Sequence, residues 1–211
     1  MEETGSAAVI STPSNDEFLR ATTLMDIHHP RIQETASRLR KRSGDPARQL
    51  FYFIRDQIRY VFMVPRKRER FLASSVLNAQ RGFCTQKAIL FCALARALQI
   101  PAGIWFYDIV DATLDTQIAA LLKTRTLYRH GVAALWLQGA WRRLDATLDS
   151  DSTLRKGLKP VEYRPLADCL MPSRTSGGAR HIDYVRDHGL VSDVSFDQIT
   201  GWFRETYPHL F

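Results

Sequence analysis

A long apolar helix that begins at a cysteine constrains this chain more than any other stretch. The run Ile89–Leu98 is apolar apart from one arginine, and Pro101 forbids any further helix. Gly82 and Cys84 stand directly before the run, so the sequence predicts that the Cys84 sulfur lies at a helix N-terminus. There the unpaired N–H groups and the helix dipole favour the thiolate, the nucleophilic form of cysteine. Because most intracellular cysteines are buried apolar residues, position alone does not make Cys84 reactive.

Length and composition indicate a globular protein without membrane spans. The 211 residues suffice for one sizeable domain, and no stretch reaches the length of apolar sequence that a membrane span needs. The three cysteines, an odd number, argue against a disulfide framework and suit a reducing compartment. Residues 1–14 are small and polar, with no basic segment leading into an apolar run, as a secretory signal would have. We therefore expect a cytoplasmic protein with a flexible tail at residues 1–14.

A net charge of +7 and a pI near 9.6 raise the question of nucleic-acid binding. Basic residues gather at 38–42 and at 66–70. Since no nucleic-acid motif or aromatic stacking platform accompanies them, we interpret both clusters as solvated surface and expect no nucleic-acid partner. An acidic substrate or partner protein remains an open alternative.

Periodicity divides the chain into helices and strands. Asp45 and Pro46 are typical of a helix start, and the following apolar residues, Leu50, Phe51, Ile54 and Ile58, share one helical face. Helices are also expected over 31–42, 74–80, part of 111–129 (as a lid over a cleft), 181–191 and 195–207, and a strand over 102–110. We expect one domain at 15–211, with a core at about 46–149 and a C-terminal helical extension at about 150–211.

A hairpin after residue 129 brings a histidine and an aspartate close together. The strands His130–Leu137 and Ala140–Thr147 flank Gln138-Gly139. If those two residues form the turn, Asp145 is a diagonal neighbour of His130, with backbones roughly 7–8 Å apart. A three-residue turn would reverse the faces and separate the two side chains.

Cysteine, histidine and aspartate in this arrangement form a nucleophile, a base and an orienting group. An imidazole can take the thiol proton, and a carboxylate fixes its tautomer and stabilises its charge. Cys84, His130 and Asp145 are therefore the candidate catalytic residues, with Asp149 as an alternative orienting group. His28-His29 are interpreted as a structural or surface pair, and neither Cys-x-x-Cys nor His-x-x-x-His spacing supports a zinc site. We expect no metal and no cofactor.

Three motifs resemble those of one known family. The stretch Gly82–Ala88, followed by Ala95–Ala102, resembles the cysteine motif of the transglutaminase-like superfamily. His130 and the stretch Gly139–Thr147 are similar to its histidine and aspartate motifs, including a tryptophan four residues before the aspartate. The helix at 53–60 is also similar, so the resemblance covers at least residues 46–149. Weaker similarity to a bacterial branch extends over 24–30 and 181–208.

This resemblance implies a papain-like α+β fold, in which the cysteine helix packs against an antiparallel sheet that carries the histidine and the aspartate. It also implies a Cys84 nucleophile, a His130 base and an Asp145 partner. Members of the superfamily cleave amides or join acyl thioesters to amines, so the expected substrate is a peptide, a protein or an acyl thioester. We favour hydrolysis or small-scale acyl transfer over crosslinking.

One departure from the family pattern concerns the positions after the histidine. Many members carry an aromatic residue and then an acidic residue where this chain has Val132 and Ala134. The triad is unaffected, but any substrate contact made by those residues is lost. The alternative hypothesis is a catalytically inactive binding module that uses the same cleft and the basic surface.

Overall fold

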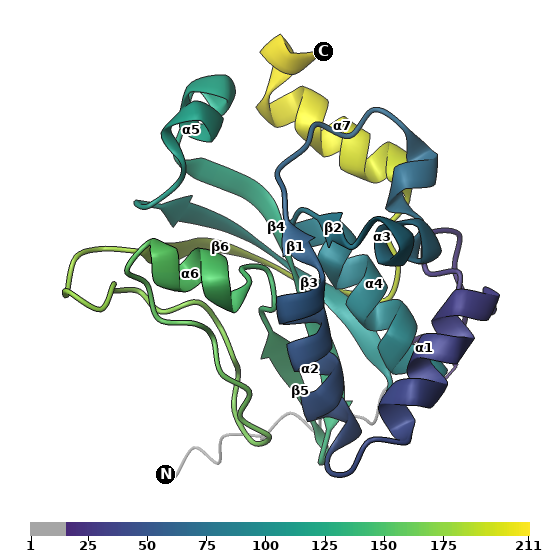
Figure 1. Cartoon of the computed structure of the whole chain (residues 1–211). Coiled ribbons are helices and arrows are strands. Elements are labelled where there is room, and N and C mark those ends of the chain that lie inside the picture. The colour runs from purple at the N-terminus through teal and green to yellow at the C-terminus, as the bar shows by residue number, and fades with distance from the viewer. Residues whose placement is uncertain (1–15) are drawn as a thin grey trace, which may run out of the picture.

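Helix α4 (Cys84–Ala97) lies at the centre of the structure, and the other elements pack around it (Figure 1). The computed structural model describes residues 16–211. The flexible tail expected at 1–14 lies outside these described residues. The sequence prediction that Cys84 opens a helix is confirmed, because Cys84 is the first residue of α4.

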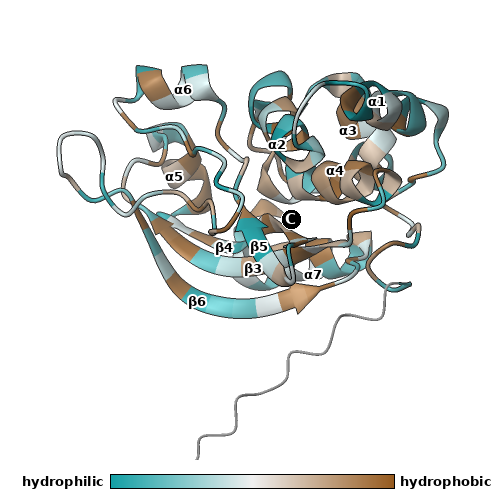
Figure 2. Ribbon diagram, turned by 90° about the horizontal axis from the view of Figure 1, so that it is seen from below, coloured by the Kyte–Doolittle hydropathy of each residue, from teal (hydrophilic) through white to brown (hydrophobic). Residues whose placement is uncertain are grey.

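Three helices form a layer with α4 on one face of the sheet (Figure 2). They are α1 (Pro30–Arg40), α2 (Pro46–Gln57) and α3 (Ala73–Ala79). The predicted start of α2 is confirmed: the Asp45 side chain accepts a hydrogen bond from Ala47 N at 2.9 Å, and Pro46 is the first helical residue. The predicted apolar face of α2 is buried against the core.

The sheet has four antiparallel strands in the order β5 (Ala140–Leu144), β4 (Thr126–Leu137), β3 (Ala102–Asp111) and β6 (Ile182–Val191). The hairpin β4–β5 has the predicted two-residue turn. Trp136 pairs with Trp141 across it, with ring centroids 5.6 Å apart. The α+β prediction, with a cysteine helix against an antiparallel sheet, is confirmed.

Shorter elements connect these layers. Strands β1 (Arg59–Tyr60) and β2 (Arg81–Gly82) pair in parallel just before α4. The others are η1 (Arg68–Phe71), α5 (Thr116–Leu122), α6 (Ser150–Arg155), α7 (Phe196–Thr206) and η2 (Pro208–Leu210). None of the helices within residues 16–211 is both long enough and apolar enough to cross a membrane.

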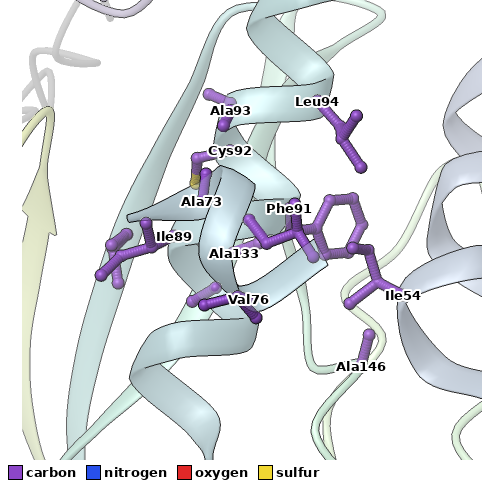
Figure 3. Close-up of a cluster of buried hydrophobic side chains, with 14 of the residues drawn as sticks. Ile54, Ala73, Val76, Ile89, Phe91, Cys92, Ala93, Leu94, Ala133 and Ala146 are labelled. Carbon is purple, nitrogen blue, oxygen red and sulfur yellow. The ribbon is translucent and has the colours of Figure 1, made fainter. Parts of the chain in front are cut away.

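The core surrounds α4 on all sides (Figure 3). Apolar side chains of α4 contact α2 through Ile54, α3 through Ala73 and Val76, and the sheet through Ala133. Burial of a helix over its whole circumference explains why its sequence is apolar without a polar stripe.

The C-terminal part of the chain differs from the prediction. Residues 181–191 were expected to be helical, but Ile182–Val191 form strand β6, which pairs with β3. The residues after 149 are therefore not a purely helical extension, since they complete the sheet. A strand at a sheet edge is stabilised by its neighbour rather than by its own sequence, and this neighbour, β3, is about 80 residues away in the chain.

The segment before His130 also differs. Only Thr116–Leu122 are helical, capped by the Asp115 side chain, which accepts a hydrogen bond from Gln117 N at 2.9 Å. Strand β4 begins at Thr126, so His130 lies within the strand rather than at its start. The helix expected over 195–207 is confirmed as α7.

Candidate active site

Cys84 is held at the first turn of α4 by local polar contacts. Phe83 N donates to the Gln86 side chain at 3.2 Å, which fixes the entry to the helix. The Thr85 hydroxyl lies 3.9 Å from Cys84 Sγ. Cys84 is 8% exposed, so its sulfur lies at the edge of the core, where the free N–H groups of a helix start meet the surface.

His130 and Asp145 form a buried pair. His130 Nε2 lies 2.8 Å from Asp145 Oδ2, and both side chains are almost fully buried. Asp145 is held in place by Thr147 N, which donates to Oδ1 at 3.1 Å, and by the Tyr184 hydroxyl, which donates to Oδ2 at 3.2 Å. The predicted proximity of His130 and Asp145 is therefore present in the structure.

A β-bulge lies directly before His130 in β4. Asp108 of β3 faces two residues of β4, the second of which is Arg129, directly before the histidine. Arg129 has φ 54°, in the left-handed region, and its N–H donates to Asp108 Oδ1 at 3.0 Å. The same carboxylate oxygen accepts from His188 Nε2 at 2.8 Å. Bulges beside functional sites re-aim a side chain, and this one ends where the His130 side chain must point into the site.

Gly131 lets the sheet approach the start of α4. A β-carbon at this position would lie 3.3 Å from Thr85 Cα, 3.2 Å from the Phe106 ring and 3.4 Å from the Ile104 side chain. All three contacts are tighter than usual or at the limit, and one is with the backbone of α4. Glycine is therefore the residue that keeps His130 and Cys84 in neighbouring layers at short range.

The electrostatics of the site favour a thiolate–imidazolium pair. Burial raises the pKa of Cys84, but the charge and side chain of His130 more than offset it, so the Cys84 pKa is lowered overall. The Gly131 N–H and the Thr85 hydroxyl act in the same direction. Burial lowers the pKa of His130, but the charges of Asp145 and Cys84 outweigh it and raise this pKa overall.

The two imidazole nitrogens have different surroundings. Nε2 is bonded to Asp145, whereas Nδ1 is buried and makes no hydrogen bond of ordinary geometry with residues 16–211. Nδ1 is thus the nitrogen left free to exchange a proton with the Cys84 sulfur. A base whose second nitrogen is fixed by a carboxylate is the arrangement that activates a nucleophilic thiol.

The other candidates lie elsewhere. Asp149 caps α6 by accepting a hydrogen bond from Ser152 N at 2.8 Å, and its carboxylate forms no hydrogen bond with His130. Cys92 is buried on α4, where burial raises its pKa to about 12 and its thiol donates to Gly103 O at 3.0 Å. Burial also raises the pKa of Cys169. Neither cysteine has the surroundings of a nucleophile.

His29 and the two positions that depart from the family pattern, Val132 and Ala134, take no part in the side-chain hydrogen bonds of the candidate triad. His29 Nδ1 accepts a hydrogen bond from Arg31 N at 3.2 Å and caps α1. Across residues 16–211, no three His, Cys, Asp or Glu side chains gather closely enough to hold a metal ion. Val132 and Ala134 are both buried in the sheet, so the departure from the family pattern falls in the core.

Two tyrosines in the site were not found from the sequence. Tyr184 of β6 bonds Asp145, and Tyr60 of β1 lines the same pocket as His130. Burial raises the pKa of Tyr60 well above its usual value, and the charges of Cys84, Asp111 and Asp145 raise it further. Neither tyrosine has a local sequence signal, since the sequence predicts a helix where β6 lies and only an extended connection around Tyr60.

Comparison with known proteins gives a family match and two similar structures. A sequence model described as the transglutaminase-like superfamily matches residues 31–146. No curated protein matches the chain significantly. A candidate cysteine protease from Cytophaga hutchinsonii is 18% identical with a TM-score of 0.49, over 84% of this chain and 53% of that one.

The second similar structure is a candidate protease from Parabacteroides distasonis. It is 17% identical with a TM-score of 0.38, over 56% of this chain and 23% of that one. The chain thus matches about half the length of the first structure and about a quarter of the second.

Proposed function

This chain belongs to the transglutaminase-like superfamily, and we propose that it is a cysteine enzyme that transfers the acyl group of a peptide amide to water through an acyl-enzyme. The observation that carries the proposal is that His130 Nε2 lies 2.8 Å from the buried Asp145 carboxylate. It is supported by Nδ1, which has no hydrogen-bond partner among residues 16–211, and by the lowered pKa of the Cys84 thiol at the start of α4. A thiol, a base and an orienting carboxylate are what nucleophilic acyl transfer requires.

The first step forms the acyl-enzyme. The Cys84 thiolate attacks the amide carbonyl carbon, and the carbonyl oxygen takes up negative charge as the C–S bond forms. His130 Nδ1, protonated in the resting pair, then gives its proton to the leaving amine as the C–N bond breaks. Asp145 keeps the imidazole in place and stabilises its charge, without accepting the proton itself.

Donors for the developing oxyanion lie at the same helix start. The N–H groups of the first turn of α4, beginning with Cys84, have no partner within the helix, and such groups stabilise an oxyanion effectively. Tyr60 is the candidate side-chain donor. Its raised pKa keeps the hydroxyl protonated, and the hydroxyl is near enough to Cys84 for the thiolate charge to contribute to that shift.

The second step releases the product. His130 takes a proton from water, whose oxygen attacks the thioester carbonyl, and the C–S bond breaks to regenerate the Cys84 thiolate and a carboxylic acid. If an amine replaces water, the same step forms an amide. The acceptor therefore decides between hydrolysis and ligation, and the triad serves both.

Intact-mass spectrometry tests this proposal. The protein is mixed with a panel of peptides and acyl thioesters and quenched in acid, and we expect a mass increase equal to the acyl portion of a substrate. Cys84→Ala should abolish the adduct, whereas Cys92→Ala should retain it. His130→Ala should slow both formation and loss of the adduct.

Absence of acylation at Cys84 would be equally informative. If no member of the panel acylates Cys84, and iodoacetamide labels Cys84 no faster than Cys92 and Cys169, the chain is an inactive binding module. If adducts form without an amine but decay only after an amine is added, the enzyme is a ligase rather than a hydrolase.

A further inference from the structure

A pocket beside His130 has an apolar interior. His130 and Tyr60 line it together with three buried apolar residues, Ile109, Leu114 and Met171. These side chains come from β3, from the connection after it and from the segment before β6. The catalytic mechanism uses none of the three apolar residues. Apolar pockets beside a catalytic residue commonly hold a side chain of the substrate.

The pocket continues into a groove that is lined by residues of both α5 and α6. Tyr60, Ile118 and Leu148 line both the inner pocket and the groove. Further out, Leu121 of α5 is 45% exposed on the groove wall. The groove therefore offers apolar contacts beyond the inner pocket.

Three cations, Arg59, Arg155 and Lys156, line this groove. None of the three forms an ion pair with any residue between 16 and 211. Lys156 also borders the inner pocket. Uncompensated cations on the rim of a binding groove attract and orient negatively charged ligands.

The carboxylates of the groove are already engaged. Asp115 caps α5 by accepting hydrogen bonds from Gln117 N at 2.9 Å and from Ile118 N at 3.3 Å. Asp111, in the inner pocket, accepts from Thr113 N at 2.7 Å and from its hydroxyl at 2.8 Å. Both acids therefore serve local turns and caps, and they leave the three cations of the outer groove free for a ligand.

We propose that this groove selects peptides that carry a bulky apolar residue next to the bond under attack and an acidic residue further along on the same side. The apolar side chain occupies the inner pocket beside His130, and the acidic side chain meets Arg59, Arg155 and Lys156. This inference rests on the proposed peptide hydrolysis, which it extends to a substrate class.

Cleavage-site profiling tests the proposal. A peptide library made from a digested proteome is incubated with the full chain, and mass spectrometry maps residues on both sides of each cut. We expect Leu, Ile, Val, Met or Phe next to the bond, with Asp and Glu enriched over the next few residues on that side. High salt should reduce the acidic enrichment, since rim charges are screened.

Two double charge-reversal variants have the same change in net charge. They test whether the preference for acidic peptides comes from the groove or from the overall positive charge of the protein. Arg155→Glu with Lys156→Glu should lower kcat/KM about tenfold for a synthetic acidic peptide, relative to its matched neutral peptide. Lys41→Glu with Arg42→Glu, an exposed pair after α1, should leave that ratio unchanged. Ile118→Asp should weaken the preference for apolar residues.

The outcomes distinguish the two claims. Cleavage without an apolar or acidic preference, or a preference that the Arg155/Lys156 variant keeps, overturns the substrate class and leaves peptide hydrolysis standing. An uncut library, from a protein whose Cys84 still alkylates in a His130-dependent way, overturns peptide hydrolysis itself and with it the substrate class.

Discussion

Gly131 sets the distance between the sheet and the start of α4. A methyl group there would lie 3.3 Å from the Thr85 backbone, so the strand that carries His130 would have to move away from the helix that carries Cys84. The Gly131 N–H also helps to lower the pKa of Cys84. Gly131 therefore affects both the distance between β4 and α4 and the pKa of Cys84, although it has no side chain.

We expect Gly131→Ala to reduce the alkylation rate of Cys84 at neutral pH by about tenfold, since small displacements of reacting groups are costly. The free energy of unfolding should fall by only about 1–2 kcal/mol, as in other overpacked sites. Iodoacetamide labelling followed by peptide mapping gives the rate, and urea unfolding gives the stability.

Gly201→Ala is the matched control, because a β-carbon at position 201 of α7 meets no atom within 4 Å. It should leave the labelling rate unchanged and slightly stabilise the helix. Equal labelling of Cys84 in the wild type and in Gly131→Ala would show that the approach of β4 does not set the site geometry.

The sequence singled out Cys84, His130 and Asp145 as candidate catalytic residues because each lies beside a strong local signal: a helix start, a strand and a two-residue turn. It left Asp149 open as an alternative, since spacing along a strand cannot tell which carboxylate meets the imidazole. It could not find Tyr184, whose hydroxyl reaches Asp145 from β6, 39 residues away.

The bulge in β4 directly precedes His130. Asp108 of β3 accepts hydrogen bonds from Arg129 N and from His188 Nε2. It is 7% exposed, so both bonds form largely out of water. One carboxylate thus ties the bulged strand to both β3 and β6.

Asp108→Ala should leave both donors unsatisfied and lower the free energy of unfolding by about 2 kcal/mol. Because the bulge directly precedes His130, the rate of Cys84 alkylation should fall as well. Thermal unfolding and site-resolved labelling are measured on the same preparation.

Asp183→Ala serves as a control on the neighbouring strand β6. Its ion pair with Arg180 is exposed, and exposed pairs contribute at most about 1 kcal/mol. If Asp108→Ala lowers stability but leaves the Cys84 labelling rate unchanged, the bulge contributes to stability and not to the geometry of the site.

Elements with local signals were predicted well, and those set by distant partners were not. Helix α2 shows its cap and its apolar stripe in its own residues, and the β4–β5 hairpin shows its turn. Strand β6 has charged residues in its middle and depends on β3 for its hydrogen bonds, so its sequence did not distinguish it from a helix.

Arg96 connects parts of the molecule that are far apart in sequence. It is fully buried near the end of α4. Its guanidinium donates to Arg20 O at 2.7 Å, to Ala102 O at 2.8 and 3.1 Å, and to Ser192 O. The central helix is thereby fastened to the N-terminal segment, to the start of β3 and to the chain after β6.

We expect Arg96→Lys to lower the free energy of unfolding by about 3 kcal/mol, because one ammonium group cannot reach all three carbonyls and buried acceptors are left unpaired. For a chain of this size the melting temperature should fall by about 6–12 °C. Differential scanning calorimetry measures it.

The exposed Arg31→Lys variant is the control and should unfold within about 0.5 kcal/mol of the wild type. A similarly small effect of Arg96→Lys would mean that packing alone holds the three segments together.

Two buried basic side chains of α4 could not be predicted from the sequence. Lys87 and Arg96 are both buried, and both donate to backbone carbonyls. Burial lowers the pKa of Lys87 to about 7. Lys87 Nζ donates to Ile58 O at 2.5 Å and to Arg55 O at 3.3 Å, at the end of α2. Backbone carbonyl partners cannot be read from the sequence, because every residue has a carbonyl group. Only the folded structure explains why these basic side chains are buried.

The pH dependence of Cys84 alkylation tests the central claim most directly. An ordinary cysteine thiol has a pKa of about 8.5, and the charge of His130 lowers the pKa of Cys84 below its usual value despite burial. Since only the thiolate reacts, the rate of iodoacetamide labelling should rise with pH and reach its midpoint at a lower pH than for a free cysteine in a short peptide. Cys92, whose pKa is about 12, should remain unlabelled over the same range.

His130→Ala removes the charge that lowers the pKa and leaves the burial that raises it, so its midpoint should move to higher pH. Asp145→Asn should move it in the same direction. A wild-type midpoint below that of a free cysteine, which rises in both variants, is the result we predict. A wild-type midpoint at or above that of a free cysteine, or one that is unchanged when His130 is removed, would contradict the proposed catalytic triad.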